Sequence, residues 1–100
     1  MDAQDQDQYV RQGSLPAYPR VFVGYRPNPP EEYRSQGAAH APDEAQYEGV
    51  IFSDGTVCIR WLTAFRSHSV WVSWGDFYNI HGHPEYGTRI EFADGLPAPW

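Results

Sequence analysis

The chain has 100 residues, of which 41% are hydrophobic and 16% are aromatic, and a formal net charge of −6. All seven basic residues are arginine, and they are dispersed along the chain, which argues against nucleic acid as a partner. No apolar stretch approaches the roughly 20 residues that span a bilayer, and the N-terminus lacks the basic and apolar pattern of a signal peptide. We therefore expect a small cytoplasmic protein with no membrane partner.

Residues 1–46 have the composition of a flexible arm and linker. Residues 1–19 are rich in Gln, Asp and Ser, and a segment with so few apolar side chains cannot offset the entropy that it loses on ordering. Residues 26–46 hold four prolines among acidic residues, which is typical of an extended linker. Residues 20–25, between these two segments, form a β-prone run that could add to the edge of a sheet, in this chain or in a partner.

Residues 47–92 carry the patterns of a compact β-rich domain, which begins with a hairpin. Asp54-Gly55 lies between two apolar runs, and this pair favours a type I′ turn, in which both central residues have positive φ. If these are the two central residues, Phe52 faces Val57. The register then predicts a core face made of Val50, Phe52, Val57 and Ile59, and an opposite face made of Gly49, Ile51, Cys58 and Arg60. Cys58, the single cysteine, is expected to be a structural thiol in mid-strand.

A third strand is predicted at residues 69–72, followed by one short helix. Ser73 stands where an N-cap should, with Asp76 three residues later as in a capping box. Gly82 and Pro84 end the helix near His81. The helical spacing places four side chains on one face of this helix: Trp74, Phe77, Tyr78 and His81.

Residues 88–92 alternate between polar and apolar side chains, which predicts a half-buried last strand with Thr88, Ile90 and Phe92 inward. The fold class is therefore α+β and mainly β: a small antiparallel sheet of order β-β-β-α-β with one short helix, preceded by an extended N-terminal arm. The domain organisation is an arm at 1–46 with a possible strand at 20–25, a compact domain at 47–92 and a tail at 93–100.

The second half holds the string Glu48-Gly49-Val50-Ile51-Phe52-Ser53-Asp54-Gly55-Thr56-Val57, then Arg60-Trp61, Ser69-Val70-Trp71, His81-Gly82-His83 and Tyr86-Gly87-Thr88-Arg89-Ile90-Glu91. The resemblance that these residues carry is to small uncharacterised proteins of actinobacteria and their phages. It implies a source and a compact domain, but no activity and no site. Residues 1–46 lie outside it.

Metal binding and catalysis have weak support in the sequence. His81 and His83 are the candidate metal ligands, because imidazole is a usual zinc ligand, but one His-x-His lacks the paired spacing of a strong zinc motif. His81 also suits the negative end of a helix dipole. Nothing resembles a nucleophile elbow or a phosphate-binding glycine loop. We therefore expect no catalytic residue and no cofactor.

The aromatic content points to an interaction protein. Sixteen aromatic residues exceed what a core of this size should absorb, so that some are expected to be exposed near arginine, as in protein interfaces. The expected interaction residues are Val21, Phe22, Val23, Arg60, Trp61, Arg66 and Trp71. An open alternative is that residues 21–23 cover these aromatic side chains within the same molecule.

The sequence thus predicts a small non-catalytic protein-protein interaction protein of actinobacterial or phage origin, whose arm orders on a protein partner or in a homo-oligomer. The first alternative is a structural or accessory component of a phage particle, in which case the protein would lie in the virion. The second alternative is a small metal-dependent or regulatory enzyme.

Overall fold

The computed structural model of the chain describes residues 16–37, 39–64 and 66–99. Residues 1–15, which form the first part of the expected arm, lie outside the described residues.

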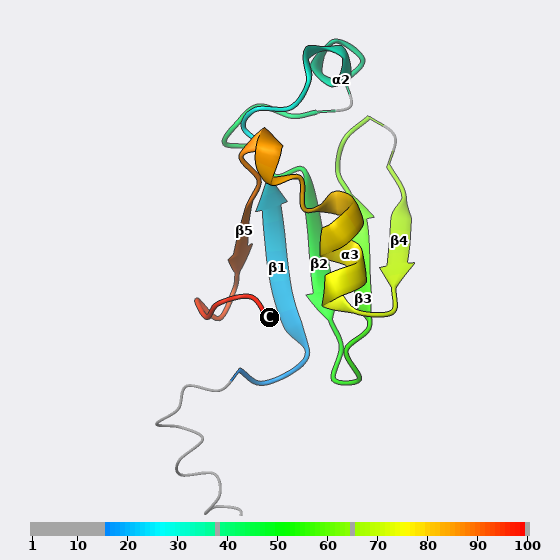
Figure 1. Cartoon of the computed structure of the whole chain (residues 1–100), viewed down its shortest axis with the longest axis vertical. Helices are drawn as coiled ribbons and strands as arrows, with labels where there is room; N and C mark the ends of the chain where they lie inside the picture. The colour runs from blue at the N-terminus through cyan, green and yellow to red at the C-terminus, as the bar shows by residue number, and fades with distance from the viewer. Residues whose placement is uncertain (1–15, 38, 65, 100) are drawn as a thin grey trace, which may run out of the picture.

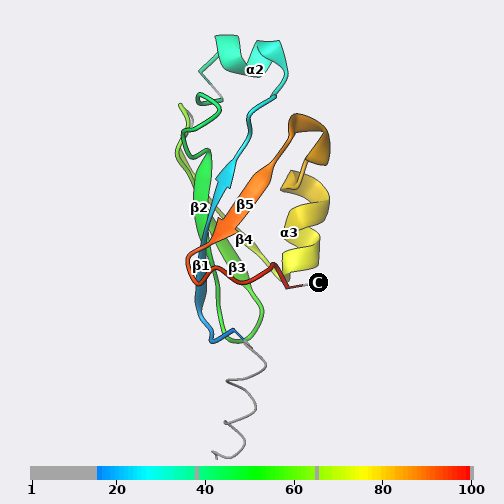
Figure 2. The same cartoon turned by 90° about the vertical axis from the view of Figure 1, so that its left-hand side faces the viewer.

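The described residues form one five-stranded antiparallel sheet with a helix on one face (Figures 1 and 2). The strand order is β4-β3-β2-β1-β5. This architecture confirms the predicted fold class. The elements are β1 (Arg20–Tyr25), α2 (Glu31–Ser35), β2 (Tyr47–Ile51), β3 (Val57–Trp61), β4 (His68–Trp71), α3 (Trp74–His81), the 3-10 turn η1 (Pro84–Tyr86) and β5 (Arg89–Phe92).

Strand β1 lies in the interior of the sheet. It pairs with β2 on one side and with β5 on the other, so residues 20–25 add to the sheet of their own chain (Figure 1). The sheet therefore includes a strand from residues 20–25 as well as the four strands within residues 47–92. Between β1 and β2, where the composition predicts an extended linker, the structure has the five-residue helix α2.

The register predicted for the hairpin is wrong by one residue. Ile51 pairs with Val57, and Val50 pairs with Cys58. The cause is a loop of three residues instead of two: the Phe52 N–H donates to the Thr56 carbonyl at 2.8 Å, and Gly55 has φ of +92°. A left-handed glycine at the end of such a loop is the usual way in which a three-residue turn joins two strands.

The shifted register exchanges the two faces of β2 but not those of β3. Gly49 and Ile51 lie on the core side, while Val50 points to the other side and Phe52 is 45% exposed. On β3, Val57 and Ile59 are fully buried, as predicted. A slip of one residue moves every side chain of a strand to the opposite face, so the correction decides which side chains a partner can reach.

Two aromatic rings lie over glycines of the neighbouring strand at the centre of the core. Phe22 pairs with Gly49, and Tyr47 pairs with Gly24. A Cβ at Gly49 would stand 2.4 Å from Phe22 Cζ, and one at Gly24 would stand 2.1 Å from Tyr47 Cζ. Both rings are fully buried. The two glycines are therefore required by close approach, because any side chain would occupy the space of the ring.

Helix α3 follows its predicted signals. The Ser73 side chain accepts a hydrogen bond from the Asp76 N–H at 3.1 Å, as an N-cap does, and the helix ends at His81. Trp74 and Phe77 are buried against the sheet. Gly82 has φ of −68°, and the left-handed residue that follows the helix is His83, with φ of +39°. Gly82 is needed for another reason, because a Cβ there would stand 2.5 Å from the Tyr78 carbonyl oxygen.

A buried arginine fastens the C-terminal segment to the sheet. Arg20 is 2% exposed, its Nε donates to Asp94 Oδ2 at 2.8 Å, and its Nη2 donates to the carbonyls of Leu96 and Pro97. The guanidinium also stacks 4.1 Å from the Phe92 ring centroid. The hydrogen bond that Arg20 donates to Asp94 lowers the pKa of the Asp94 carboxyl, because the guanidinium favours its ionised form.

Candidate functional site

The face of the sheet opposite α3 carries a row of apolar side chains. Val21 pairs with Val50, Val50 pairs with Cys58, and Cys58 pairs with Val70. Because side chains alternate between the faces of a strand, all four point to the same side, away from the core. Val21 is 53% exposed and Val70 is 73% exposed. Helix α3 lies on the other side of the sheet (Figure 2), and no helix within the described residues covers this open face.

A second row on the open face is charged. Val23 pairs with Glu48, Glu48 with Arg60, and Arg60 with His68. On the β5 side, Val23 also pairs with Glu91. The Arg60 Nη1 and Glu48 Oε1 atoms are 3.3 Å apart, and both side chains are half exposed. Glu48 on β2 and Arg60 on β3 thus separate an acidic side of the row from a basic side, while Glu91 on β5 is ion-paired with Arg89 of its own strand, Nε to Oε2 at 2.6 Å.

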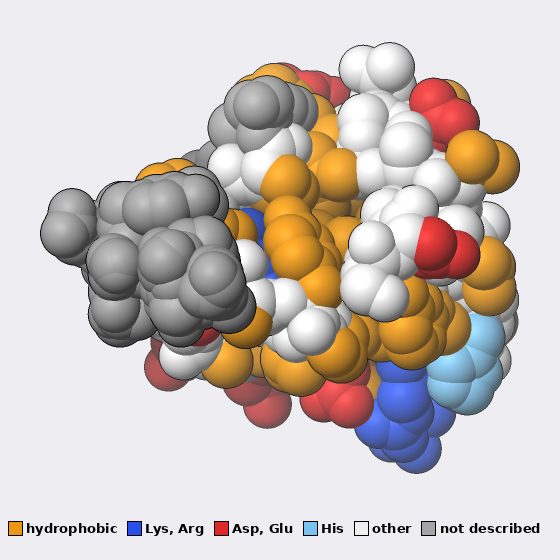
Figure 3. Space-filling view, turned by 90° about the horizontal axis from the view of Figure 1, so that it is seen from below, with side chains coloured by type: hydrophobic (Ala, Val, Ile, Leu, Met, Phe, Trp, Pro, Cys, Tyr) orange, Lys and Arg blue, Asp and Glu red, His pale blue; other side chains and the backbone are white. Residues whose placement is uncertain are grey.

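The space-filling view shows this separation of charge from one end of the molecule (Figure 3). Along the lower border, acidic side chains lie on one side, arginine and histidine lie on the other, and hydrophobic side chains lie between them. A shallow cavity of about 390 Å³ runs over the same face. Its lining is drawn from both rows: Val21, Val23, Glu48, Gly49, Val50, Cys58, Arg60 and His68. The arrangement suits contact with another flat surface.

The structure divides the interaction residues predicted from the sequence between the two faces. Val21, Val23 and Arg60 lie on the open face. Arg66 is exposed in the loop between β3 and β4.

The remaining three predicted residues, Phe22, Trp61 and Trp71, lie on the face that α3 covers. Phe22 is fully buried in the core. Trp61 and Trp71 are partly buried, and the indole N–H groups of both donate to the Ser69 hydroxyl, at 3.3 and 3.1 Å. Phe22 has no surface to offer a partner, and the two tryptophans have a role in packing.

Sequence reasoning missed two central residues of the open face, Val50 and Val70. Val50 was assigned to the core through the wrong register, and Val70 was recognised only as part of a strand. The alternation of Tyr47, Gly49 and Ile51 carries the correct signal, because it places two large apolar side chains on one face and leaves Val50 on the other.

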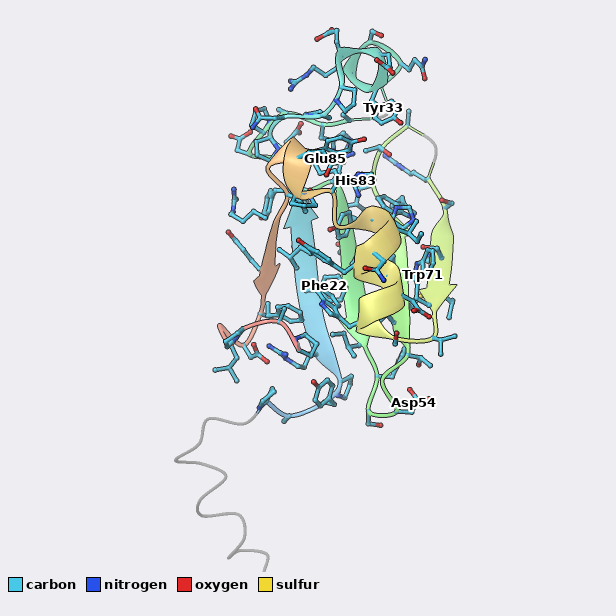
Figure 4. All side chains as sticks on the ribbon, in the orientation of Figure 1. Phe22, Tyr33, Asp54, Trp71, His83 and Glu85 are labelled. Carbon is cyan, nitrogen blue, oxygen red and sulfur yellow. The ribbon has the colours of Figure 1, made fainter. Side chains whose placement is uncertain are left out.

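The two candidate metal ligands do not point to a common centre with a third ligand. The His83 Nδ1 lies 2.9 Å from Glu85 Oε2, and the His83 ring stacks on Tyr86 with centroids 4.3 Å apart (Figure 4). The His81 ring packs against Trp61. Burial lowers the pKa of His81, and electrostatic interactions with Arg26 and His83 lower it further. Within the described part of the chain, no group of three or more His, Cys, Asp or Glu side chains could hold a metal ion.

Comparison with known proteins relates part of the chain to a phage protein family. The model of a family described as Acb5 phage protein matches residues 47–94, so the second half of the chain is similar to a phage protein family, as the sequence predicted. The matched stretch holds β2 to β5 and α3, while β1 and α2 precede it. No curated protein and no solved structure matches the chain. A search of the described residues for a helix able to span a bilayer finds none.

Proposed function

We propose that the chain is a non-catalytic interaction protein of phage origin, and that its open sheet face binds a second copy of itself. The observation that supports this proposal most strongly is the charged row, in which Glu48 and Arg60 stand side by side on neighbouring strands. The similarity to a phage protein family supports the origin. An acidic and a basic side chain that stand side by side are complementary to their own reversed copy, as a two-fold symmetric interface requires.

The pairing can be derived from the register. A two-fold axis parallel to the strands, placed between β2 and β3, sets the two sheets face to face about 10 Å apart. Glu48 of each copy then faces Arg60 of the other copy, which forms two reciprocal ion pairs. At the level of the apolar row, Val50 faces the second copy's Cys58 and Val21 faces the second copy's Val70. Glu48 and Arg60 therefore meet their complements and the apolar row meets itself in one arrangement, while Val23 faces the second copy's His68 and β5 lies outside the facing strands.

The size of this face indicates a weak dimer. Four facing strands about 4.8 Å apart, each with about five residues at about 3.3 Å, give a planar footprint of about 300 Å². A standard interface buries about 800 Å² per partner, and smaller ones are typical of transient complexes. We therefore expect a weak, transient dimer rather than a permanent one.

The test is the mass of the full chain, measured by sedimentation over a wide concentration range. The wild-type mass should rise from one chain towards two. Val21→Glu should keep the protein monomeric, because a carboxylate would be buried opposite the second copy's Val70. Ile80→Glu is the matched control: Ile80 is 56% exposed, close to the 53% of Val21, but it lies on α3 at the covered face.

The Ile80→Glu variant should associate like the wild type. A wild-type chain that stays monomeric at millimolar concentration would contradict the proposal. So would a dimer that Val21→Glu leaves intact.

A further inference from the structure

A second surface feature lies at the end of the molecule where α2, the end of α3 and η1 come together. It is a cavity of about 330 Å³. Figure 4 shows Tyr33 of α2 at the same end as His83 and Glu85. The cavity is separate from the open sheet face, and most of its lining is aromatic or hydroxyl-bearing: Tyr33, Trp61, Thr63, Ser67, His81, His83 and Tyr86.

Arg26 also lines this cavity, and its charge is buried. The side chain is 8% exposed, Nη2 donates to the His81 carbonyl at 2.6 Å, and Nε has no hydrogen-bond partner. No carboxylate among the described residues lies within ion-pair distance of it. Burial lowers the pKa of the Arg26 guanidinium, because removal from water disfavours a charge.

Aromatic rings surround the guanidinium without neutralising it. The ring centroids of Trp61, Tyr47 and Tyr86 lie 5.4, 5.6 and 5.7 Å from the guanidinium carbon. Such contacts offset part of the cost of burying a cation. They leave its positive charge in place at the wall of a depression that is open to solvent, where an anion can approach it.

We propose that this cavity binds a small organic oxyanion, a phosphate or carboxylate group attached to a planar ring. Arg26 would attract the oxyanion, since the planar guanidinium matches the geometry of carboxylate and phosphate oxygens. The hydroxyls of Thr63 and Ser67 can donate further hydrogen bonds. The rings of Tyr33 and Trp61 supply a surface for the planar part of the ligand. The volume lies at the lower end of the range for small-molecule pockets.

One carboxylate near the cavity opposes an anion. Glu85 is bound to His83 through Oε2, and its side chain is 63% exposed. Solvent screens an exposed charge much more than a buried one, so the field of Arg26 should dominate inside the cavity. This opposition provides a test with a predicted gain: removing the Glu85 charge should strengthen anion binding.

The test is a titration of the full chain, monitored by two-dimensional NMR. Three probes are titrated separately: phenyl phosphate, inorganic phosphate and phenol. Phenyl phosphate should bind more tightly than either fragment, and its affinity should fall as salt is added. Arg26→Gln should weaken phenyl phosphate binding at least tenfold. Arg89→Gln, the same change at an exposed arginine of β5 that does not line the cavity, should leave binding unaltered.

The variants of the cavity rim keep the test decisive if Arg26→Gln fails to fold. Glu85→Gln should tighten phenyl phosphate binding about twofold or more. Tyr33→Ala, at a side chain that is 41% exposed, should weaken binding of phenyl phosphate but not of inorganic phosphate.

Three results would overturn the proposal. The first is the absence of binding at millimolar phenyl phosphate. The second is equal affinity for phenol, which would remove the role of the anion. The third is equal affinity for inorganic phosphate, which would remove the role of the ring.

Discussion

Replacing Gly24 by alanine should destabilise the protein severely, because the glycine lies under the ring of Tyr47. An alanine Cβ would stand 2.1 Å from Cζ and 2.3 Å from Cε1 of that ring. Ordinary carbon contacts need about 3.5 Å or more, so the ring would have to move by well over 1 Å. It has no room to do so, since Tyr47 is fully buried and packs edge-on against Trp61 and Phe77.

The magnitude follows from this geometry. Overpacking a well-packed core costs about 1–3 kcal/mol and sometimes more. The contact at Gly24 involves a rigid, enclosed ring, so we expect a loss of at least about 3 kcal/mol in the free energy of unfolding. That is a large share of the roughly 5–15 kcal/mol of a typical domain.

Urea denaturation followed by tryptophan fluorescence measures this loss. Gly75→Ala is the matched control: its Cβ would meet nothing closer than 3.9 Å, and alanine favours the helix, so that variant should be unchanged or more stable by up to about 1 kcal/mol. The double variant Gly24→Ala/Tyr47→Leu should lose less than the sum of its single changes, because the obstructing ring is gone. A loss below about 1 kcal/mol for Gly24→Ala would refute the reasoning.

Three further predictions concern titration and capping. Burial raises the pKa of Tyr47 to about 12, so between pH 10 and 12 the Tyr47 hydroxyl ionises in the unfolded chain only. The free energy of unfolding should therefore fall as pH rises from 10 to 12, and it should fall less steeply in the Tyr47→Phe variant. Arg20 lowers the pKa of Asp94, so the stabilisation that the Asp94 carboxylate provides is present above the ordinary pKa of 3.8 and is lost as pH falls below that value. In urea denaturation at a series of pH values, Asp94→Asn should reduce this loss of stability in acid. Ser73→Ala should cost about 1 kcal/mol by urea denaturation, because it removes the N-cap hydrogen bond of α3, whereas Ser53→Ala in the exposed turn should have little effect.

The sequence predicts local features of this fold better than distant ones. Helix α3 is capped by residues within three positions of its start, so its start follows directly from Ser73, whereas the left-handed residue after its end is His83 and not the predicted Gly82. The hairpin is also local, but Asp54-Gly55 is compatible with a loop of two or of three residues. Composition and alternation alone do not distinguish a two-residue loop from a three-residue loop. Because of this ambiguity, the predicted pairing of β2 with β3 is wrong by one residue.

The candidate sites depend on contacts between distant segments. The open face becomes visible only when β1 is placed between β2 and β5, which no local pattern near residues 20–25 specifies. Arg26 stands at the start of a segment with linker composition, and its burial follows from packing against His81 and Tyr86, more than 50 positions away. Its role could therefore not be inferred from its neighbours in the chain.

The measurement that tests the central claim most directly is a mixing experiment with two charge-reversed variants. Glu48→Arg places arginine opposite arginine in the proposed dimer, and Arg60→Glu places glutamate opposite glutamate, so each variant alone should be monomeric by sedimentation. In an equimolar mixture both facing pairs become attractive, and the dimer should return. Circular dichroism checks that each variant is folded. Single variants that dimerise like the wild type, or a mixture that stays monomeric where the wild type dimerises, would contradict the account.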